Sequence, residues 1–260
     1  TVTGVQTCAL PISTISGSGA IAVEGSNSGD VLQSSPTPHT INFDVTCAGS
    51  NRLLLVGISN WPEAGGAPSG VTVNGSGTGI DRLDGSSNDM FVNQGGNDAE
   101  VYIYKKVAPD TGTNTVEISY SPNFTDSGSI AGAICLSGVD QTSPLGTWST
   151  NQGNSASPGA VTVSSVSGDM VFSVAAMEKA TVLSSDGDTD HWNYSITTDN
   201  DTPGGGGSTT AATGSTTVTW TWTGVADHWA MGAVPIKPAA GGLRSEEHTS
   251  ELQSQFRISY

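Results

Sequence analysis

The amino-acid sequence predicts an all-β protein, a two-sheet antiparallel β-sandwich of jelly-roll type. Many short segments alternate apolar and polar residues, as strands with one buried face do. Turn-forming residues separate these segments at intervals of about 8–15 residues, which is typical of sandwiches and jelly rolls. No segment carries the sustained apolar stripe of an amphipathic helix.

Two kinds of strand are expected. Residues 39–47 alternate, with Ile41, Phe43 and Val45 on one face, so that only this face is buried. Residues 51–59 form a nearly continuous apolar run, which favours a central strand covered on both faces. In chain order, the expected strands are residues 39–47, 51–59, 70–75, 99–107, 114–121, 129–139, 160–177 as two strands, 190–198, 215–224 and 228–238.

Residues 201–215 contain four consecutive glycines and several Ser and Thr residues, a composition typical of linkers. A domain boundary here would leave only residues 216–243 behind it, too few to fold alone. We therefore expect one long flexible loop inside a single domain.

The two ends of the chain are related through DNA. One DNA sequence that can encode residues 244–254, RSEEHTSELQS, has a reverse complement that is also readable as protein. Shifted by one reading frame, this reverse complement translates as TGVQTCALPI, which is residues 3–12. Opposite ends of one protein have no biological reason to share a DNA string, and these resemble translated sequencing-adapter DNA. We expect residues 1–12 and 244–260 to be adapter-derived, and residues 13–243 to form a single β-sandwich domain of a longer, multidomain protein.

The charge balance narrows the class of partner. The chain has 8 Lys and Arg against 24 Asp and Glu, a net charge of −16. Such a balance repels nucleic acid and anionic membranes, because binding to phosphate needs clustered cations. No apolar run reaches the ~18 residues of a membrane helix, so no membrane insertion is expected. A composition with few Lys residues and many Thr, Ser, Gly and Asp residues is common in secreted bacterial proteins. This composition favours an extracellular or cell-surface location.

Two cysteines remain outside the adapter-like ends, Cys47 and Cys135, each within or at the end of an apolar segment. They can form a disulfide in an oxidising compartment, or stay as two buried thiols that pack like small apolar side chains.

Six segments carry a family resemblance, and their order matches across about residues 39–238. They are NRLLLVGIS, VYIYKKVAPDTGTNTVEISYS, AGAICLSGVDQTSPLGT, SGDMVFSVAAM, VTWTWTG and HWAMGAVPIKP. Together they resemble a β-sandwich module of bacterial, metagenomic and phage-fibre-type secreted or surface proteins. The resemblance implies a jelly-roll-like fold within a longer protein. It carries no established activity, so it implies no functional residues. The Asp-rich stretch 186–201 and the four-glycine segment depart from the pattern.

An acidic segment is the candidate metal site, and calcium is the candidate cofactor. Asp186, Asp188 and Asp190 alternate as at the start of a calcium loop, and Asp199 and Asp201 are near enough in sequence to add oxygen ligands. His191 replaces the expected glycine and Thr197 the closing glutamate, so the match to an EF-hand is partial. The alternative is a solvated turn, in which Asp side chains accept hydrogen bonds from nearby backbone amides.

Tryptophans offer a candidate glycan-binding surface. Indole rings on a sandwich stack against sugar rings, and Trp61, Trp192 and Trp148 lie in or near expected loops. Trp220, Trp222 and Trp229 lie on expected strands, and core packing is the better interpretation for them.

Catalytic patterns are absent from the sequence. There is no G-x-S-x-G or H-E-x-x-H motif. A glycosidase needs two opposed carboxylates, and Glu100 and Glu117 are expected on neighbouring strands, with solvated faces as the alternative. We therefore expect a non-catalytic extracellular module for surface attachment or a structural role. A carbohydrate-binding module, calcium-dependent or not, and a glycan-active enzyme domain are the alternatives.

Overall fold

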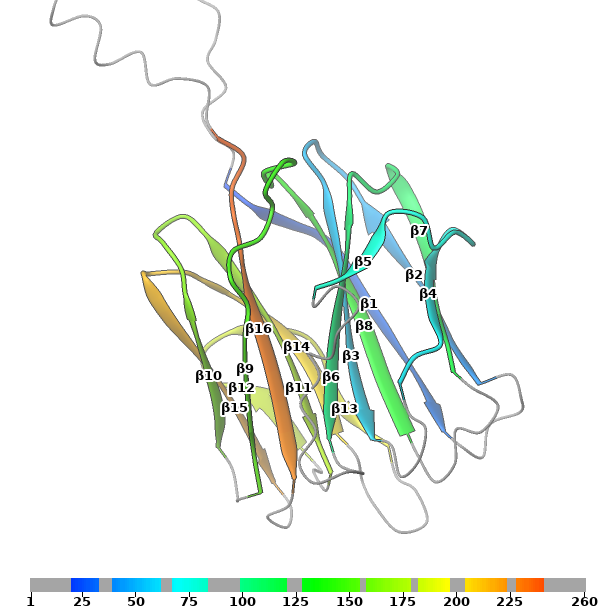
Figure 1. Ribbon diagram of the computed structural model, residues 1–260, viewed down its shortest axis with the longest axis vertical. Helices are drawn as coiled ribbons and strands as arrows, with labels where there is room; N and C mark the ends of the chain where they lie inside the picture. Colours follow the sequence, from blue (N-terminus) through cyan, green and yellow to red (C-terminus); the bar gives the residue numbers. More distant parts are fainter. Residues whose placement is uncertain are drawn as a thin grey trace, which may run out of the picture.

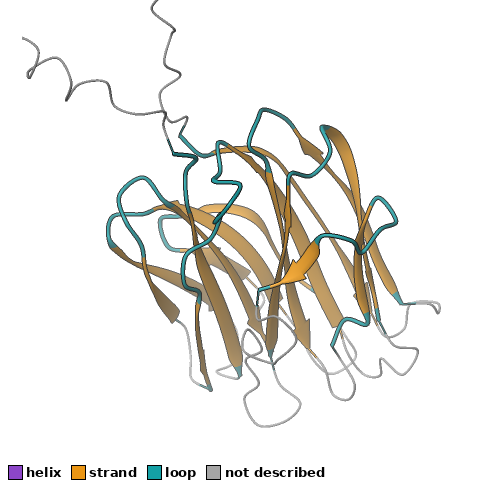
Figure 2. Ribbon diagram, turned by 45° about the horizontal axis from the view of Figure 1, so that its top comes forward, coloured by secondary structure: helices purple, strands orange, loops and turns teal. Residues whose placement is uncertain are grey.

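The computed structural model describes residues 20–32, 39–61, 67–83, 99–120, 128–154, 158–178, 182–196, 204–223 and 228–240. These residues form sixteen strands, all paired antiparallel, and contain no helix (Figures 1 and 2). It follows that none of the described segments is a helix able to cross a membrane. The prediction of an all-β antiparallel sandwich is confirmed. The adapter-like ends lie outside the described residues.

The first eight strands span residues 22–137. They are β1 (Ala22–Leu32), β2 (Thr40–Cys47), β3 (Leu53–Trp61), β4 (Gly70–Val73), β5 (Ile80–Arg82), β6 (Glu100–Val107), β7 (Gly112–Ser119) and β8 (Gly128–Ser137).

The other eight strands span residues 149–236. They are β9 (Ser149–Gly153), β10 (Gly159–Ser164), β11 (Met170–Met177), β12 (Val182–Ser185), β13 (Thr189–Ser195), β14 (Gly204–Ala211), β15 (Ser215–Thr223) and β16 (Trp229–Ile236).

The described strands form four stacked sheets, where the sequence predicts two. Sheet 1 has the order β2-β7-β4, sheet 2 has β1-β8-β3-β6-β5, sheet 3 has β13-β14-β11-β16-β9, and sheet 4 has β10-β15-β12. Apolar side chains fill the space between sheets 1 and 2, between sheets 2 and 3, and between sheets 3 and 4. The stack therefore has three apolar layers, and its two middle sheets are covered on both faces (Figure 1).

The second eight strands repeat the connectivity of the first eight. Adding eight to each strand number turns the order of sheet 2 into that of sheet 3, and the order of sheet 1 into that of sheet 4. In the first unit β1 pairs with β8, β2 with β7 and β3 with β6, the nested pairing of a jelly roll. The chain is thus two jelly-roll units that pack through their larger sheets.

Strand patterns follow from this layering. In β2, Ile41, Phe43, Val45 and Cys47 are buried while the residues between them are exposed or half-buried, because sheet 1 is an outer sheet. Strand β3 is buried at every position, as predicted for a central strand. Strand β1 was not expected, because its Gly, Ser and Asn residues resemble a turn, but it pairs with β8 along its length.

The four-glycine segment is a central strand, and the prediction of a flexible loop there is wrong. Strand β14 pairs with β13 on one side and β11 on the other, and its first six residues are buried. A Cβ atom on Gly207 would overlap the Trp192 indole, and one on Gly206 would overlap the Trp220 indole. Glycine is needed here because large rings lie directly against the backbone.

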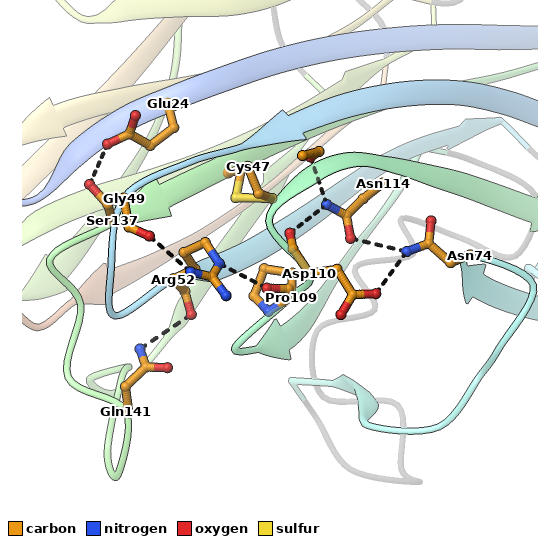
Figure 3. Close-up of a disulfide and its surroundings, with 12 residues drawn as sticks. Glu24, Cys47, Gly49, Arg52, Asn74, Pro109, Asp110, Asn114, Ser137 and Gln141 are labelled. Carbon is orange, nitrogen blue, oxygen red and sulfur yellow. Dashed lines mark hydrogen bonds between the residues drawn. A yellow bond between two sulfur atoms is a disulfide. The ribbon is translucent and has the colours of Figure 1, made fainter.

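The disulfide forms between Cys47 and Cys135, with a Cα–Cα distance of 5.3 Å. It joins β2 of sheet 1 to β8 of sheet 2, and both residues are buried. Arg52 beside it donates to the carbonyl oxygens of Pro109 and Gly49, both at 2.8 Å (Figure 3). We call this end of the stack, where β2 leads into β3, the disulfide end. A disulfide is stable in an oxidising compartment.

We expect Gly207→Ala to lower the free energy of unfolding by roughly 2–3 kcal/mol, because the added methyl group displaces Trp192 in a close-packed layer. Urea unfolding followed by circular dichroism measures the change. Gly70→Ala is the control, since a Cβ atom there meets no other atom within 4 Å. Equal stabilities for the two variants would contradict the packing described for β14.

We expect replacement of both Cys47 and Cys135 by Ala to cost roughly 3–5 kcal/mol of stability. The bond closes a loop with a sequence separation of 88 residues, so its loss enlarges the entropy of the unfolded chain. Thermal unfolding of the wild type with and without dithiothreitol, beside the double variant, measures this. The added reductant should not change the midpoint of the double variant.

Candidate functional site

A layer of polar side chains is buried at the end of the first unit opposite the disulfide. It lies between sheets 1 and 2, where β3 ends and where β6 and β8 begin. We call these side chains the polar layer. Its members are Asn60, Glu100, Tyr102, Tyr120 and Ser129, each at most 5% exposed. Such a concentration of polar groups inside an apolar core is the feature that most needs a chemical explanation.

Glu100 is the ionisable centre of the polar layer and is 4% exposed. Its Oε2 accepts hydrogen bonds from the Tyr102 hydroxyl at 2.8 Å and from the Asn60 side-chain amide at 3.2 Å. Burial raises the pKa of Glu100 to about 7, although both hydrogen bonds act in the opposite direction. This carboxyl group can therefore gain or lose a proton near neutral pH.

The tyrosines of the layer are held in their neutral form. Burial raises the pKa of Tyr102 far above its ordinary value, and the nearby Glu100 carboxyl adds to the shift. Burial likewise raises the pKa of Tyr120, whose hydroxyl is hydrogen-bonded to that of Ser129. These two hydroxyl groups are hydrogen-bonding groups and not bases at physiological pH.

One member of the polar layer, Asn60, also lines a small cavity at this end of sheet 2. The cavity has a volume of about 10 Å³, about that of one water molecule. Trp61 and Ile130 in its lining belong to the apolar layer between sheets 2 and 3, so the cavity lies on the face of sheet 2 away from the polar layer. Glu100 is not part of this lining and is 4% exposed, and its hydrogen bonds can store a proton and fix strand ends.

Two open grooves lie at the disulfide end of the second unit, one on each side of the turn that joins β10 to β11. The first has a volume of 610 Å³, and Asp188, Thr189, Thr209 and Thr210 supply polar atoms to its lining. The second has a volume of 650 Å³ and extends to Asp140 and Lys237. Sequence analysis did not predict these grooves, because their walls come from turns that are far apart in the chain.

The acidic segment 186–190 comprises the turn between β12 and β13 and the first two residues of β13, and it contributes to one wall of the first groove. Asp190 accepts hydrogen bonds from the backbone and hydroxyl of Ser185 and from the Asn193 side chain. Asp186 is exposed at the surface. Hydrogen bonds of this kind are those of a structural turn, the alternative to a calcium loop.

Asp188 and Asp190 are both half-buried, and Asp188 is the one that lines the first groove. Its Oδ2 is buried and has no hydrogen-bond partner in the described part of the chain. Burial raises its pKa, Thr210 lowers it through a hydrogen bond, and the carboxylates of Asp190 and Asp186 raise it. No three His, Cys, Asp or Glu side chains of the described residues lie together as metal ligands would. Asp199 and Asp201 lie outside the described residues, so the calcium site stays a prediction.

The candidate glycan-binding tryptophans pack against the layer between sheets 2 and 3. Trp61 and Trp192 are each 5% exposed, and Trp148 is partly buried against the same layer. Trp220, Trp222 and Trp229 are buried between sheets 3 and 4. The six rings therefore form no common open surface on which a sugar could stack.

The two glutamates considered for catalysis do not lie on neighbouring strands, so that expectation is wrong. Glu100 is on β6 in sheet 2, and Glu117 is on β7 in sheet 1. Strand β7 follows β6 in the chain but crosses to the other sheet of the jelly roll. Glu100 is buried and Glu117 is half-buried.

Comparison of the chain with protein-family models finds no match, and comparison with curated proteins finds no relative.

We expect Asp188→Asn to raise the free energy of unfolding at pH 7 by up to about 1 kcal/mol, after allowance for solvent screening. The raised pKa of Asp188 means that its contribution to stability is present at acidic pH and is lost as pH rises through that pKa. Urea unfolding without calcium measures the change, and the exposed Asp186→Asn is the control. Stabilisation of the wild type, but not of Asp188→Asn, by added calcium would instead support the calcium site.

Proposed function

We propose that this chain is a non-catalytic extracellular module, serving in surface attachment or as a structural part of a larger secreted or phage-like protein. The observation that carries the proposal is the buried Cys47–Cys135 bond between two sheets of a fully layered β-stack. A layered β-protein with a buried disulfide is suited to the outside of the cell, because disulfides persist in that oxidising environment.

The distribution of ionisable groups supports a structural role. Glu100, whose pKa burial raises to about 7, is enclosed between sheets 1 and 2 and is 4% exposed. An enzyme of the glycosidase type would instead need two carboxylates facing a sugar-sized cleft. The resemblance of segments within about 39–238 to surface and phage-fibre modules agrees with this role.

Glycan binding is the second proposal, and the two grooves of the second unit are its specific support. Thr189, Thr209, Thr210 and Asp188 offer hydroxyl and carboxyl groups that can bond to sugar hydroxyls in the first groove. We favour this location over the predicted tryptophans, because Trp61 and Trp192 are 5% exposed and Trp148 is partly buried.

A polysaccharide pull-down with the full chain, with and without EDTA, separates the two proposals. For a structural module we expect no retention on any polysaccharide. Retention that is lost in Thr189→Trp, which fills the first groove, but kept in Thr217→Trp, on the outer face of sheet 4, would establish glycan binding instead. Release of new reducing ends from the polysaccharide would contradict both proposals and show an enzyme.

A further inference from the structure

We propose that Glu100 is a proton-dependent latch, which holds the polar end of the first unit closed when protonated and loosens it when ionised. The geometry carries the proposal. The carboxyl group is 4% exposed, and its two hydrogen-bond donors, Tyr102 and Asn60, are both neutral. A buried carboxylate needs a cation or several strong donors to offset its loss of water, and two neutral donors to one oxygen fall short of that.

Among the described residues, no ion pair compensates the charge of Glu100. On β6, burial raises the pKa of Tyr102 far above its ordinary value, so its phenol is neutral at physiological pH. On β5, the Arg82 guanidinium lies 5.8 Å from the centre of the Tyr102 ring. No Lys, Arg or His side chain of the described residues forms an ion pair with Glu100.

Two further titratable residues lie at this end of the same sandwich. Tyr120 follows β7 and is neutral, since burial raises its pKa. His39 precedes β2 and is buried, and its carbonyl oxygen accepts a hydrogen bond from the Tyr120 amide at 3.0 Å. Both residues belong to the described part of the chain at this end of the sandwich.

Ionisation of Glu100 would act on several strands at once. Asn60 is the second-to-last residue of β3, and Ser129 is the second residue of β8. The Ser129 hydroxyl lies 3.4 Å from the Ser59 carbonyl oxygen. The Ser59 hydroxyl in turn donates to the carbonyl oxygen of Ala175 in sheet 3, at 2.7 Å. Water drawn toward a carboxylate here would therefore disturb the ends of β3, β6 and β8 and their contact with the second unit.

The direction of the pH effect follows from the raised pKa. An ordinary Glu titrates near 4.5 in the unfolded chain, and Glu100 titrates at about 7 in the folded protein. Its contribution to stability is complete below pH 4.5 and is lost as pH rises to about 7. Over this interval the folding equilibrium constant should fall up to about tenfold per pH unit, or roughly 300-fold in all.

Urea unfolding of the full chain between pH 4.5 and 8.5 tests the latch. We expect the wild type to lose stability across this range relative to Glu100→Gln, which keeps a side chain of the same shape without charge. Glu117→Gln, a half-buried carboxyl on sheet 1, is the matched control and should follow the wild type. The same pH dependence in Glu100→Gln and wild type would overturn the proposal.

A second measurement uses only the wild type and does not depend on the variant folding. Carbon-13 NMR titration of labelled Glu carboxyl groups should show one resonance with a midpoint near 7. Hydrogen exchange, corrected for its intrinsic pH dependence, should become faster at the ends of β3 and β6 above that midpoint. Midpoints near 4.5 for every Glu, or strand ends that exchange alike at pH 6 and 8, would reject the latch.

Discussion

The indole of Trp192 lies between sheets 2 and 3, against backbone that only glycine can supply. A Cβ atom on Gly132 of β8 or on Gly207 of β14 would overlap this ring, and one on Gly57 of β3 would also come too close to it. The ring thus lies against both units at once. Sheet 1 packs on the other face of sheet 2, and sheet 4 packs on the other face of sheet 3. The arrangement of all four sheets therefore depends on the spacing between sheets 2 and 3, which Trp192 fills.

The two units share one connectivity but stabilise it differently. The first closes one end of its inner layer with the Cys47–Cys135 bond and carries the buried polar groups around Glu100 at the other. The second has Trp220, Trp222 and Trp229 in its inner layer, and Gly206 makes room for Trp220. The buried Glu100 network therefore belongs to the first unit, and the open grooves lie beside the second.

Alternating apolar and polar residues, and continuous apolar runs, predicted much of the fold. Each of these patterns depends on whether one face of a strand or both faces are covered by other sheets. Strand β2 alternates since it belongs to an outer sheet, and β3 is apolar throughout since sheet 2 lies between two others. The same signal failed for β14, where side chains of neighbouring strands, and not its own, fill the space beside it. Four glycines therefore resemble a linker in sequence while forming a buried strand.

The candidate sites were harder to predict, because a site depends on which strands the fold brings together. Trp61 was a plausible binding residue next to a Pro-Gly-rich segment, but β3 continues up to that tryptophan and buries it. Glu100 resembled a solvated residue near Glu117. The jelly-roll crossover places them in different sheets and encloses Glu100 beside Asn60, which is 40 residues away in sequence. Local pattern gives the covered face of a strand, whereas the protonation of a buried carboxyl depends on partners that only the folded topology supplies.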